Sequence, residues 1–159
     1  LDPKGVYSSL REKKLEPRRA PDEDLVFQAA GLLARYDYEL PELFAPALPR
    51  DFPEGSQRDL LSLVLTGKSP EKAFNFLKGI GFVDAYWPEI GSLAGVDQSK
   101  EFHPEGDAWE HTMETFRYRK LPDFRLSLAL LLHDTGKPIA ASAEGRRFDR
   151  HAELGAAAA

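Results

Sequence analysis

The sequence predicts an all-α fold, and three features of the chain support this prediction. Apolar residues recur at helical spacing in several segments between residues 22 and 135. Residues that favour helix starts and helix ends flank these segments. No segment shows the alternation of apolar and polar residues that a half-buried strand requires. The 159 residues, 42% of them apolar, are enough for one ordinary domain or for two small helical domains.

Three helices are expected in the first half of the chain. The first opens with the acidic residues 22–24 and continues to Tyr36, because acidic side chains stabilise the positive end of the helix dipole. Several prolines then interrupt the chain, and residues 56–66 are expected to form the second helix. The third starts at Ser69–Pro70, with serine as N-cap, and ends at one of the glycines that follow. A linker is expected from there to Phe102.

Two further helices are expected in the second half. Asp107 and Glu110, three residues apart, have the spacing of a capping box with Asp in place of Ser or Thr. One face of this helix carries Trp109, Thr112, Met113 and Phe116. Residues 123–135 are apolar nearly all round, which predicts a buried central helix. Gly136, with Pro138 just beyond it, is expected to end that helix.

Composition restricts the classes of function. The net charge of −5 argues against a wholly basic nucleic-acid-binding protein, although residues 1–20 carry six basic residues against three acidic ones. The chain has no cysteine, which excludes disulfides, thiolate metal sites and a cysteine nucleophile, and favours a reducing, cytoplasmic setting. The longest mainly apolar run, residues 126–132, includes Ser127 and is too short to span a membrane.

All four histidines lie after residue 100: His103, His111, His133 and His151. His133 and Asp134 are adjacent at the end of the apolar helix, where a buried charged pair is costly unless it is paired or binds a metal. His111 lies one helix upstream and His151 one helix downstream. Imidazole and carboxylate ligands suit Mn, Fe, Zn, Ni or Co, with Mg possible where carboxylates dominate. A His–Asp pair alone is a weak signal, but the cluster favours a divalent metal site over structural histidines.

The motifs around these histidines resemble the HD domain of metal-dependent phosphohydrolases. The matching pieces are His111, HDTGKP at residues 133–138 and RHAELGA from Arg150. FHPEGDAWEHT, at residues 102–112, resembles the form of this domain in bacterial tRNA nucleotidyltransferases and poly(A) polymerases. Further upstream, DEDLVFQAAGLLARYDYELP resembles the first neck helix of that family and FLKGIGFVDAYWPEIGSLAGVDQ its passage from neck to HD domain. The resemblance implies a helical neck packed on an HD-domain helical bundle.

The resemblance also implies a domain organisation. Residues 1–20 correspond to the end of a missing nucleotidyltransferase head or to a linker, residues 21–95 to the neck, and residues 96–159 to a truncated HD domain. The chain starts at Leu1 and ends in alanines, and family members close the HD site with a later Asp. We therefore expect the chain to be part of a longer protein.

The neck departs from the family pattern where the family reads the incoming nucleotide base. Asp24 is kept, but Phe27 stands where the family has Arg, and a phenyl ring cannot make the hydrogen bonds that base reading needs. In a second motif Arg58 is kept, whereas Ser62 replaces a Glu. The Gly-Ser and Asp-x-Asp elements of the nucleotidyltransferase head are not in these 159 residues. Nucleotide addition by this chain alone is therefore not expected.

The resemblance implies metal-assisted hydrolysis of phosphoesters of nucleotides or RNA ends. His111, His133 and Asp134 would hold the divalent metal, and His151 would bind a second ion or the substrate phosphate. Asp134 and Lys137 are the candidate catalytic residues. The positive charge of Lys137 would stabilise charge on the phosphate. The alternative for Lys137 is an ordinary lysine at a helix C-terminus.

His103 is a candidate for orienting His111 or its own loop. The alternative is that His103 binds the metal. Two alternative functions stay open. One is a non-catalytic RNA-binding helical body that binds tRNA as part of a full-length protein. The other is a stand-alone HD signalling enzyme that acts on free nucleotides. No membrane partner is expected.

Overall fold

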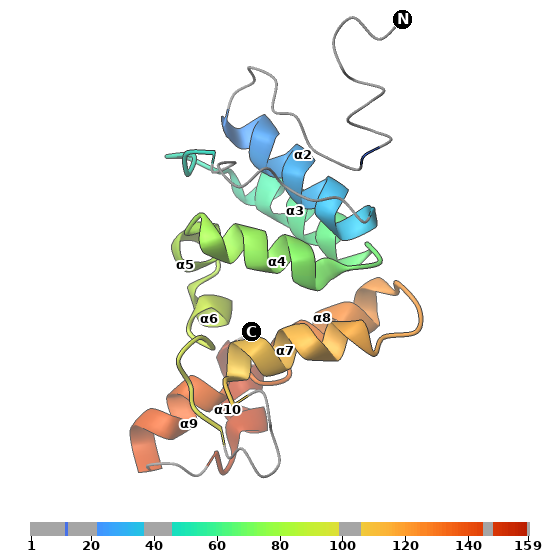
Figure 1. The fold of residues 1–159 in the computed structure, drawn as a ribbon. Helices are drawn as coiled ribbons and strands as arrows, with labels where there is room; N and C mark the ends of the chain where they lie inside the picture. Colours follow the sequence, from blue (N-terminus) through green and yellow to red (C-terminus); the bar gives the residue numbers. More distant parts are fainter. Residues whose placement is uncertain (1–11, 13–21, 37–45, 99–105, 145–147, 159) are drawn as a thin grey trace, which may run out of the picture. The chain divides into compact units, whose positions relative to one another are not determined.

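The computed structural model describes residue 12 and residues 22–36, 46–98, 106–144 and 148–158 (Figure 1). In these ranges every regular element is a helix, which confirms the predicted all-α fold. The described β structure is one isolated antiparallel bridge between Asp97 and Asp107. Backbone packing divides the chain into two compact units that meet in sequence between Gly81 and Phe82. Because packing alone defines these units, the functional boundaries at residues 20 and 95 stay predictions.

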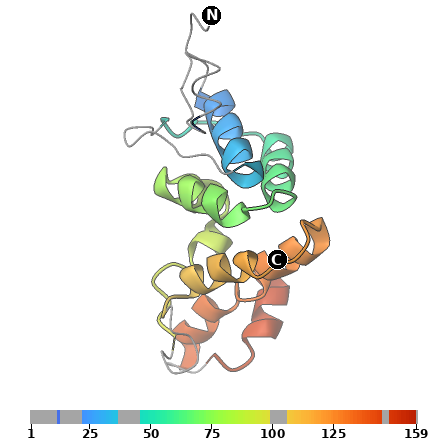
Figure 2. The same ribbon diagram turned by 45° about the vertical axis from the view of Figure 1, so that its right-hand side comes forward.

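The first unit is built on three helices, α2 (Asp22–Arg35), α3 (Glu54–Leu65) and α4 (Pro70–Gly79). α2 packs against both α3 and α4, as the views in Figures 1 and 2 show. The buried side chains between them are mostly apolar: Val26, Ala29, Ala30, Leu33, Leu60, Val64, Ala73, Phe74 and Leu77. All three helices were predicted from their apolar spacing, and their ends lie within two residues of the predicted ones.

The helix-start and helix-end signals of α4 are confirmed. Ser69 is the N-cap residue, although its side chain makes no capping hydrogen bond, and Pro70 takes the first helical position. Gly81 follows the helix with a φ of +79°, a conformation that glycine adopts without the steric cost other residues have.

Phe27 has a packing role in α2. Its ring stacks on that of Phe52, with centroids 6.2 Å apart and an interplanar angle of 17°. Asp24 and Arg58, the other two neck positions singled out in the sequence, are exposed. The residue that replaces the family's arginine thus contributes to the apolar interior of the first unit.

The predicted linker after α4 is wrong for residues 82–91, which form two short helices. These are α5 (Phe82–Tyr86) and α6 (Pro88–Gly91). Pro88 lies in the first turn of α6, where its missing N–H costs no helical hydrogen bond, so here it starts a helix. The ring of Phe82 packs edge-on against Trp87, with centroids 5.1 Å apart.

The second unit contains α7 (Ala108–Arg117), α8 (Phe124–Leu132), α9 (Lys137–Glu144) and α10 (His151–Ala158). Asp107 caps α7 as predicted, since its Oδ1 accepts hydrogen bonds from the backbone N–H groups of Trp109 and Glu110. Its Oδ2 accepts a third from Gly95, at 2.6 Å. The predicted stripe of α7 is buried: Trp109, Thr112, Met113 and Phe116.

The prediction that residues 123–135 form a fully buried helix is wrong. In α8 only Ser127 and Leu131 are buried, whereas Phe124, Leu126 and Ala129 are exposed. α7 packs along one side of α8. Apolar composition shows what a helix is able to bury, but the number of neighbouring elements decides how much of it is buried.

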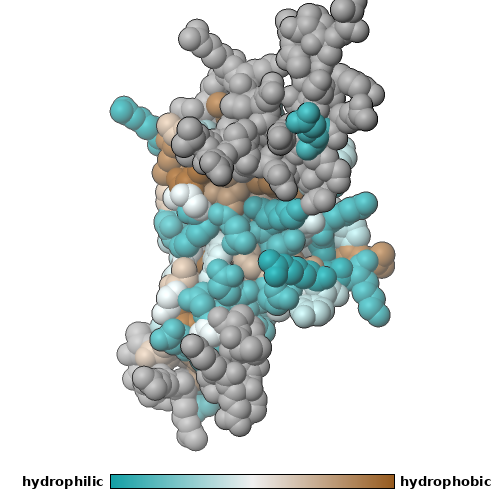
Figure 3. All heavy atoms as spheres, viewed as in Figure 1, coloured by the Kyte–Doolittle hydropathy of each residue, from teal (hydrophilic) through white to brown (hydrophobic). Residues whose placement is uncertain are grey.

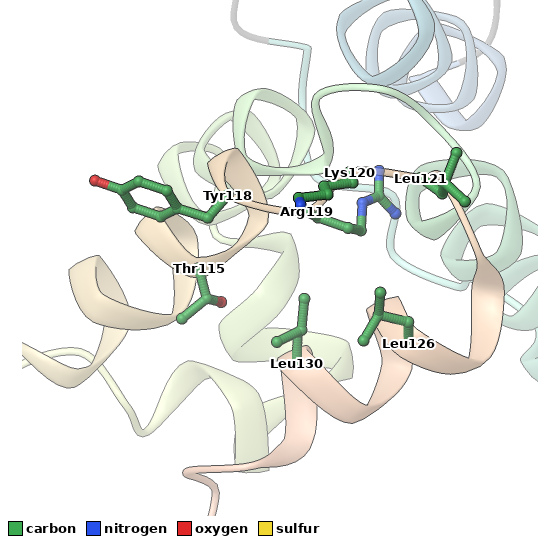
Figure 4. A pocket seen from close by; sticks show the side chains of 7 residues that line it. All are labelled: Thr115, Tyr118, Arg119, Lys120, Leu121, Leu126 and Leu130. Atoms are coloured by element: carbon green, nitrogen blue, oxygen red, sulfur yellow. The ribbon is translucent and has the colours of Figure 1, made fainter.

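An apolar pocket of about 520 Å³ opens between the C-terminal end of α7 and α8 (Figure 4). Leu126 and Leu130 of α8 line it together with Tyr118 and Leu121. No described helix is long and apolar enough to cross a bilayer. Hydrophilic side chains cover most of the coloured surface seen in Figure 3.

The predicted end of the apolar helix also needs correction. α8 ends at Leu132, His133 is its C-cap in right-handed α conformation, and a turn follows up to Gly136. Pro138 lies in the first turn of α9, so it opens the next helix. Gly136 is needed for close packing: a Cβ there would lie 1.9 Å from the carbonyl oxygen of His151 and 2.5 Å from the nitrogen of Gly155.

Candidate metal centre

Three of the predicted ligands converge on one point in the second unit. His111 comes from the middle of α7, and His133 and Asp134 come from the turn after α8. One ligand atom from each of the three lies within 4.8 Å of the other two. The Oδ2 atom of Asp134 is 3.1 Å from Nε2 of His133 and 3.9 Å from Nε2 of His111. The two imidazole rings have centroids 5.5 Å apart.

His151 lies on the other oxygen of the same carboxylate. Its Nε2 is 3.6 Å from Oδ1 of Asp134. His151 is the first residue of α10, and this helix reaches the turn after α8 because Gly136 and Gly155 allow the two backbones to approach closely. The predicted group of His111, His133, Asp134 and His151 is therefore brought together around Asp134.

Backbone carbonyls hold two of the imidazole rings. Nδ1 of His133 donates to the carbonyl oxygen of Leu130 and Nδ1 of His151 to that of Phe148, each at 2.7 Å. A ring held in this way presents Nε2 on its other side, which is the arrangement typical of metal-binding histidines. In both residues Nε2 is the atom that faces Asp134.

Lys137 pairs with the same oxygen of Asp134 that His111 and His133 face. Its Nζ donates to Oδ2 of Asp134 at 2.6 Å and also to Oε1 of Gln98. The ring of Phe148 lies below the ammonium group, with its centroid 5.6 Å away. Lys137 and Asp134 are both buried, at 6% and 2% exposed. The ammonium group is thus already paired with two oxygen acceptors in the protein interior.

The charges of the cluster are set by these contacts. Burial alone would raise the pKa of Asp134, but hydrogen bonds from His133 and Lys137 outweigh it and hold the pKa at about 2. The hydrogen bond to Asp134 is the main cause that raises the pKa of His133 above its ordinary value of 6.5, against the lowering effect of burial. Asp134 is therefore ionised at neutral pH, as a metal ligand must be.

The pH dependence of the metal-free protein follows from these two shifts. The contribution of His133 to stability is complete below pH 6.5 and is lost as the pH rises through the raised pKa. The contribution of Asp134 is complete above pH 3.8 and is lost as the pH falls towards 2. As the pH rises above 6.5, the free energy of unfolding, measured in urea, should therefore fall more steeply for the wild type than for His133→Gln. Parallel pH profiles would contradict this.

The remaining predicted residues lie elsewhere. His103 lies outside the described residues. Asp24, Phe27 and Arg58 belong to the first unit and are not members of the cluster. Gln98, by contrast, lies within the predicted linker and carries no signal in the sequence that predicts a role.

No protein-family model matches the chain, and no solved structure matches it. Similarity is found with curated proteins. A "Multifunctional CCA protein" of Neisseria gonorrhoeae is 32% identical over 153 residues, which cover 86% of this chain and 37% of the relative. The protein of the same name from Nitrosococcus oceani is 30% identical over 171 aligned residues, covering 99% of this chain and 42% of the relative. This chain is homologous to part of the multifunctional CCA proteins.

These relatives support the resemblance to the tRNA nucleotidyltransferase family. A third, from Halorhodospira halophila, is 35% identical over 89 residues, or 55% of this chain. The chain spans less than half of the length of the relatives it matches.

Proposed function

We propose that this chain is the C-terminal part of a tRNA nucleotidyltransferase- or poly(A) polymerase-like protein that carries an HD-type metal-dependent phosphohydrolase site. Its substrates are phosphoesters of nucleotides or RNA ends, and its location is the cytoplasm. One observation carries the hydrolase proposal: ligand atoms of His111, His133 and Asp134, from two separate parts of the fold, lie within 4.8 Å of one another. The similarity to multifunctional CCA proteins supports the family.

The residues of the cluster fit a divalent transition metal. Imidazole nitrogens and one carboxylate form a ligand set that suits Mn, Fe, Co, Ni or Zn. Mg fits this set less well, because it prefers oxygen ligands. The bonds from Nδ1 of His133 and His151 to backbone carbonyls leave both Nε2 atoms facing the carboxylate. When bound, such an ion makes water acidic enough to supply hydroxide near neutral pH and neutralises charge on phosphoryl oxygens.

Each residue of the cluster has a proposed role. His111, His133 and Asp134 hold the ion. His151, whose Nε2 is 3.6 Å from Oδ1 of Asp134, would take a second ion or the substrate phosphate. Lys137 acts through Asp134, because its buried ammonium group already pairs with that carboxylate and keeps it ionised and oriented.

The net reaction adds water across one ester bond. Hydroxide from water forms the new bond to phosphorus, and the bond from phosphorus to the ester oxygen breaks. The ester oxygen leaves with the proton that the water lost. No oxidant or second substrate is needed, so a phosphodiester with a chromogenic leaving group is a sufficient probe.

The test is hydrolysis of bis-p-nitrophenyl phosphate and of 2′,3′-cyclic AMP with Mn²⁺ or Ni²⁺ added. We expect metal-dependent hydrolysis that falls at least about 100-fold in His133→Ala and His111→Ala. Lys68→Ala, an exposed change in the first unit, is the control and should keep full activity. Activity that survives both histidine changes would contradict the proposal.

The same samples separate the hydrolase from a non-catalytic RNA-binding body. An RNA-binding body predicts tRNA affinity that falls steeply with salt and does not depend on metal. Metal-independent tRNA binding without hydrolysis of either probe would favour that second function.

A further inference from the structure

Gln98 ends a buried chain of hydrogen bonds that leads through Lys137 to Asp134. Oε1 of Gln98 accepts from Nζ of Lys137, and the same ammonium group donates to Oδ2 of Asp134 at 2.6 Å. The three residues Gln98, Lys137 and Asp134 are 7%, 6% and 2% exposed. Lys137 thus connects Gln98, which is outside the cluster, to the carboxylate at its centre.

The backbone of Gln98 is held in place beside the start of α7. Its N–H donates to the carbonyl oxygen of Gly106 at 2.7 Å, and the neighbouring Asp97 forms the isolated bridge with Asp107. Asp107 is the N-cap of α7, the helix that carries His111. The amide of Gln98 therefore projects from a position that is fixed relative to the cluster.

The contact with Lys137 determines how the side-chain amide of Gln98 is oriented. An ammonium group has only donors, so the carbonyl oxygen of Gln98 has to face Lys137. Nε2 is then buried without a hydrogen-bond partner in the part of the chain that the structure describes.

We infer that Gln98 is a positioning residue of the Asp134 centre, which acts by holding Lys137 against the carboxylate. With Gln98 as second acceptor, the buried ammonium group stays on Oδ2 and the carboxylate keeps its alignment with His111 and His133. Partners that orient a ligand in this way commonly change metal affinity by 10- to 100-fold when they are lost. This inference rests on the proposed metal site.

The test is a double-mutant cycle on the full chain, with Mn²⁺ affinity measured by isothermal titration calorimetry. Gln98→Met keeps the length of the side chain but removes the acceptor, and we expect it to weaken Mn²⁺ binding about tenfold. In a Lys137→Met background the same change should have almost no further effect, since the residue through which Gln98 acts is gone. Gln98→Glu keeps an oxygen acceptor and should retain close to wild-type affinity.

The controls separate the possible failures. Gln57→Met removes a half-buried glutamine of the first unit, one that donates to the Phe52 carbonyl, and should leave Mn²⁺ affinity unchanged. Thermal unfolding without metal checks that each variant is folded. If the wild type does not bind Mn²⁺, the proposed function itself fails. If the wild type and Gln98→Met bind Mn²⁺ equally well, only the role of Gln98 is overturned. The same holds if Gln98→Met weakens Mn²⁺ binding equally in the wild-type and Lys137→Met backgrounds.

Discussion

Replacing Asp134 with alanine is expected to abolish metal binding and to lower the free energy of unfolding by about 3–5 kcal/mol. Asp134 contributes the carboxylate to the cluster and also pairs with Lys137 at 2.6 Å in the protein interior. Removing Asp134 leaves the ammonium group of Lys137 buried, with a hydrogen bond to the neutral side chain of Gln98 and without its paired carboxylate. An uncompensated buried charge is one of the most destabilising changes a point mutation makes.

A second variant separates the two effects of this change. In Asp134→Ala combined with Lys137→Met, both charges of this buried pair are gone, so much of the lost stability should return, while metal binding should not. Urea unfolding measures the first quantity and elemental analysis after dialysis the second. A double variant that binds metal like the wild type would exclude Asp134 as a ligand.

Gly136→Ala is the other change with a large expected effect. Its new methyl group would lie 1.9 Å from the His151 carbonyl oxygen and 2.5 Å from the Gly155 nitrogen. Both are backbone atoms, so α10 has to shift as a whole. We expect a loss of about 3 kcal/mol, at the upper end of the usual cost of overpacking, and a separation of His151 from Asp134.

Gly79→Ala is the matched control for this prediction. Gly79 is the last residue of α4, and nothing lies within 4 Å of the added methyl group. Alanine should therefore be neutral or slightly stabilising there, through its better helix propensity. Thermal unfolding of the two variants side by side measures the difference. Equal unfolding temperatures would contradict the close approach of α10 to the turn after α8.

Local signals predicted most of the helices and the members of the cluster. The cap of α7 is a property of Asp107 and the residues just after it, and the structure confirms it. The cluster was predicted because His133 and Asp134 are adjacent, with His111 and His151 one helix away on either side. Such inferences depend on spacing along one or two helices, which sequence alone contains.

Packing between elements could not be predicted in the same way. The exposure of Leu126, at 45%, depends on how many neighbours α8 has. The role of Gly136 depends on the approach of α10, which the pattern Gly136–Pro138 does not contain. Gln98 contacts Lys137 across 39 positions of sequence, and a single sequence shows no link between two such residues.

Metal content is the measurement that tests the central claim most directly. The protein would be purified without chelator and without a nickel affinity column, and its metals determined by elemental analysis. The cluster around Asp134 predicts a near-stoichiometric content of Mn, Fe, Co, Ni or Zn that is lost in His133→Ala. Protein that carries no metal as purified and takes up none from added Mn²⁺ or Zn²⁺, or a metal content unchanged in His133→Ala, would contradict a metal centre at Asp134.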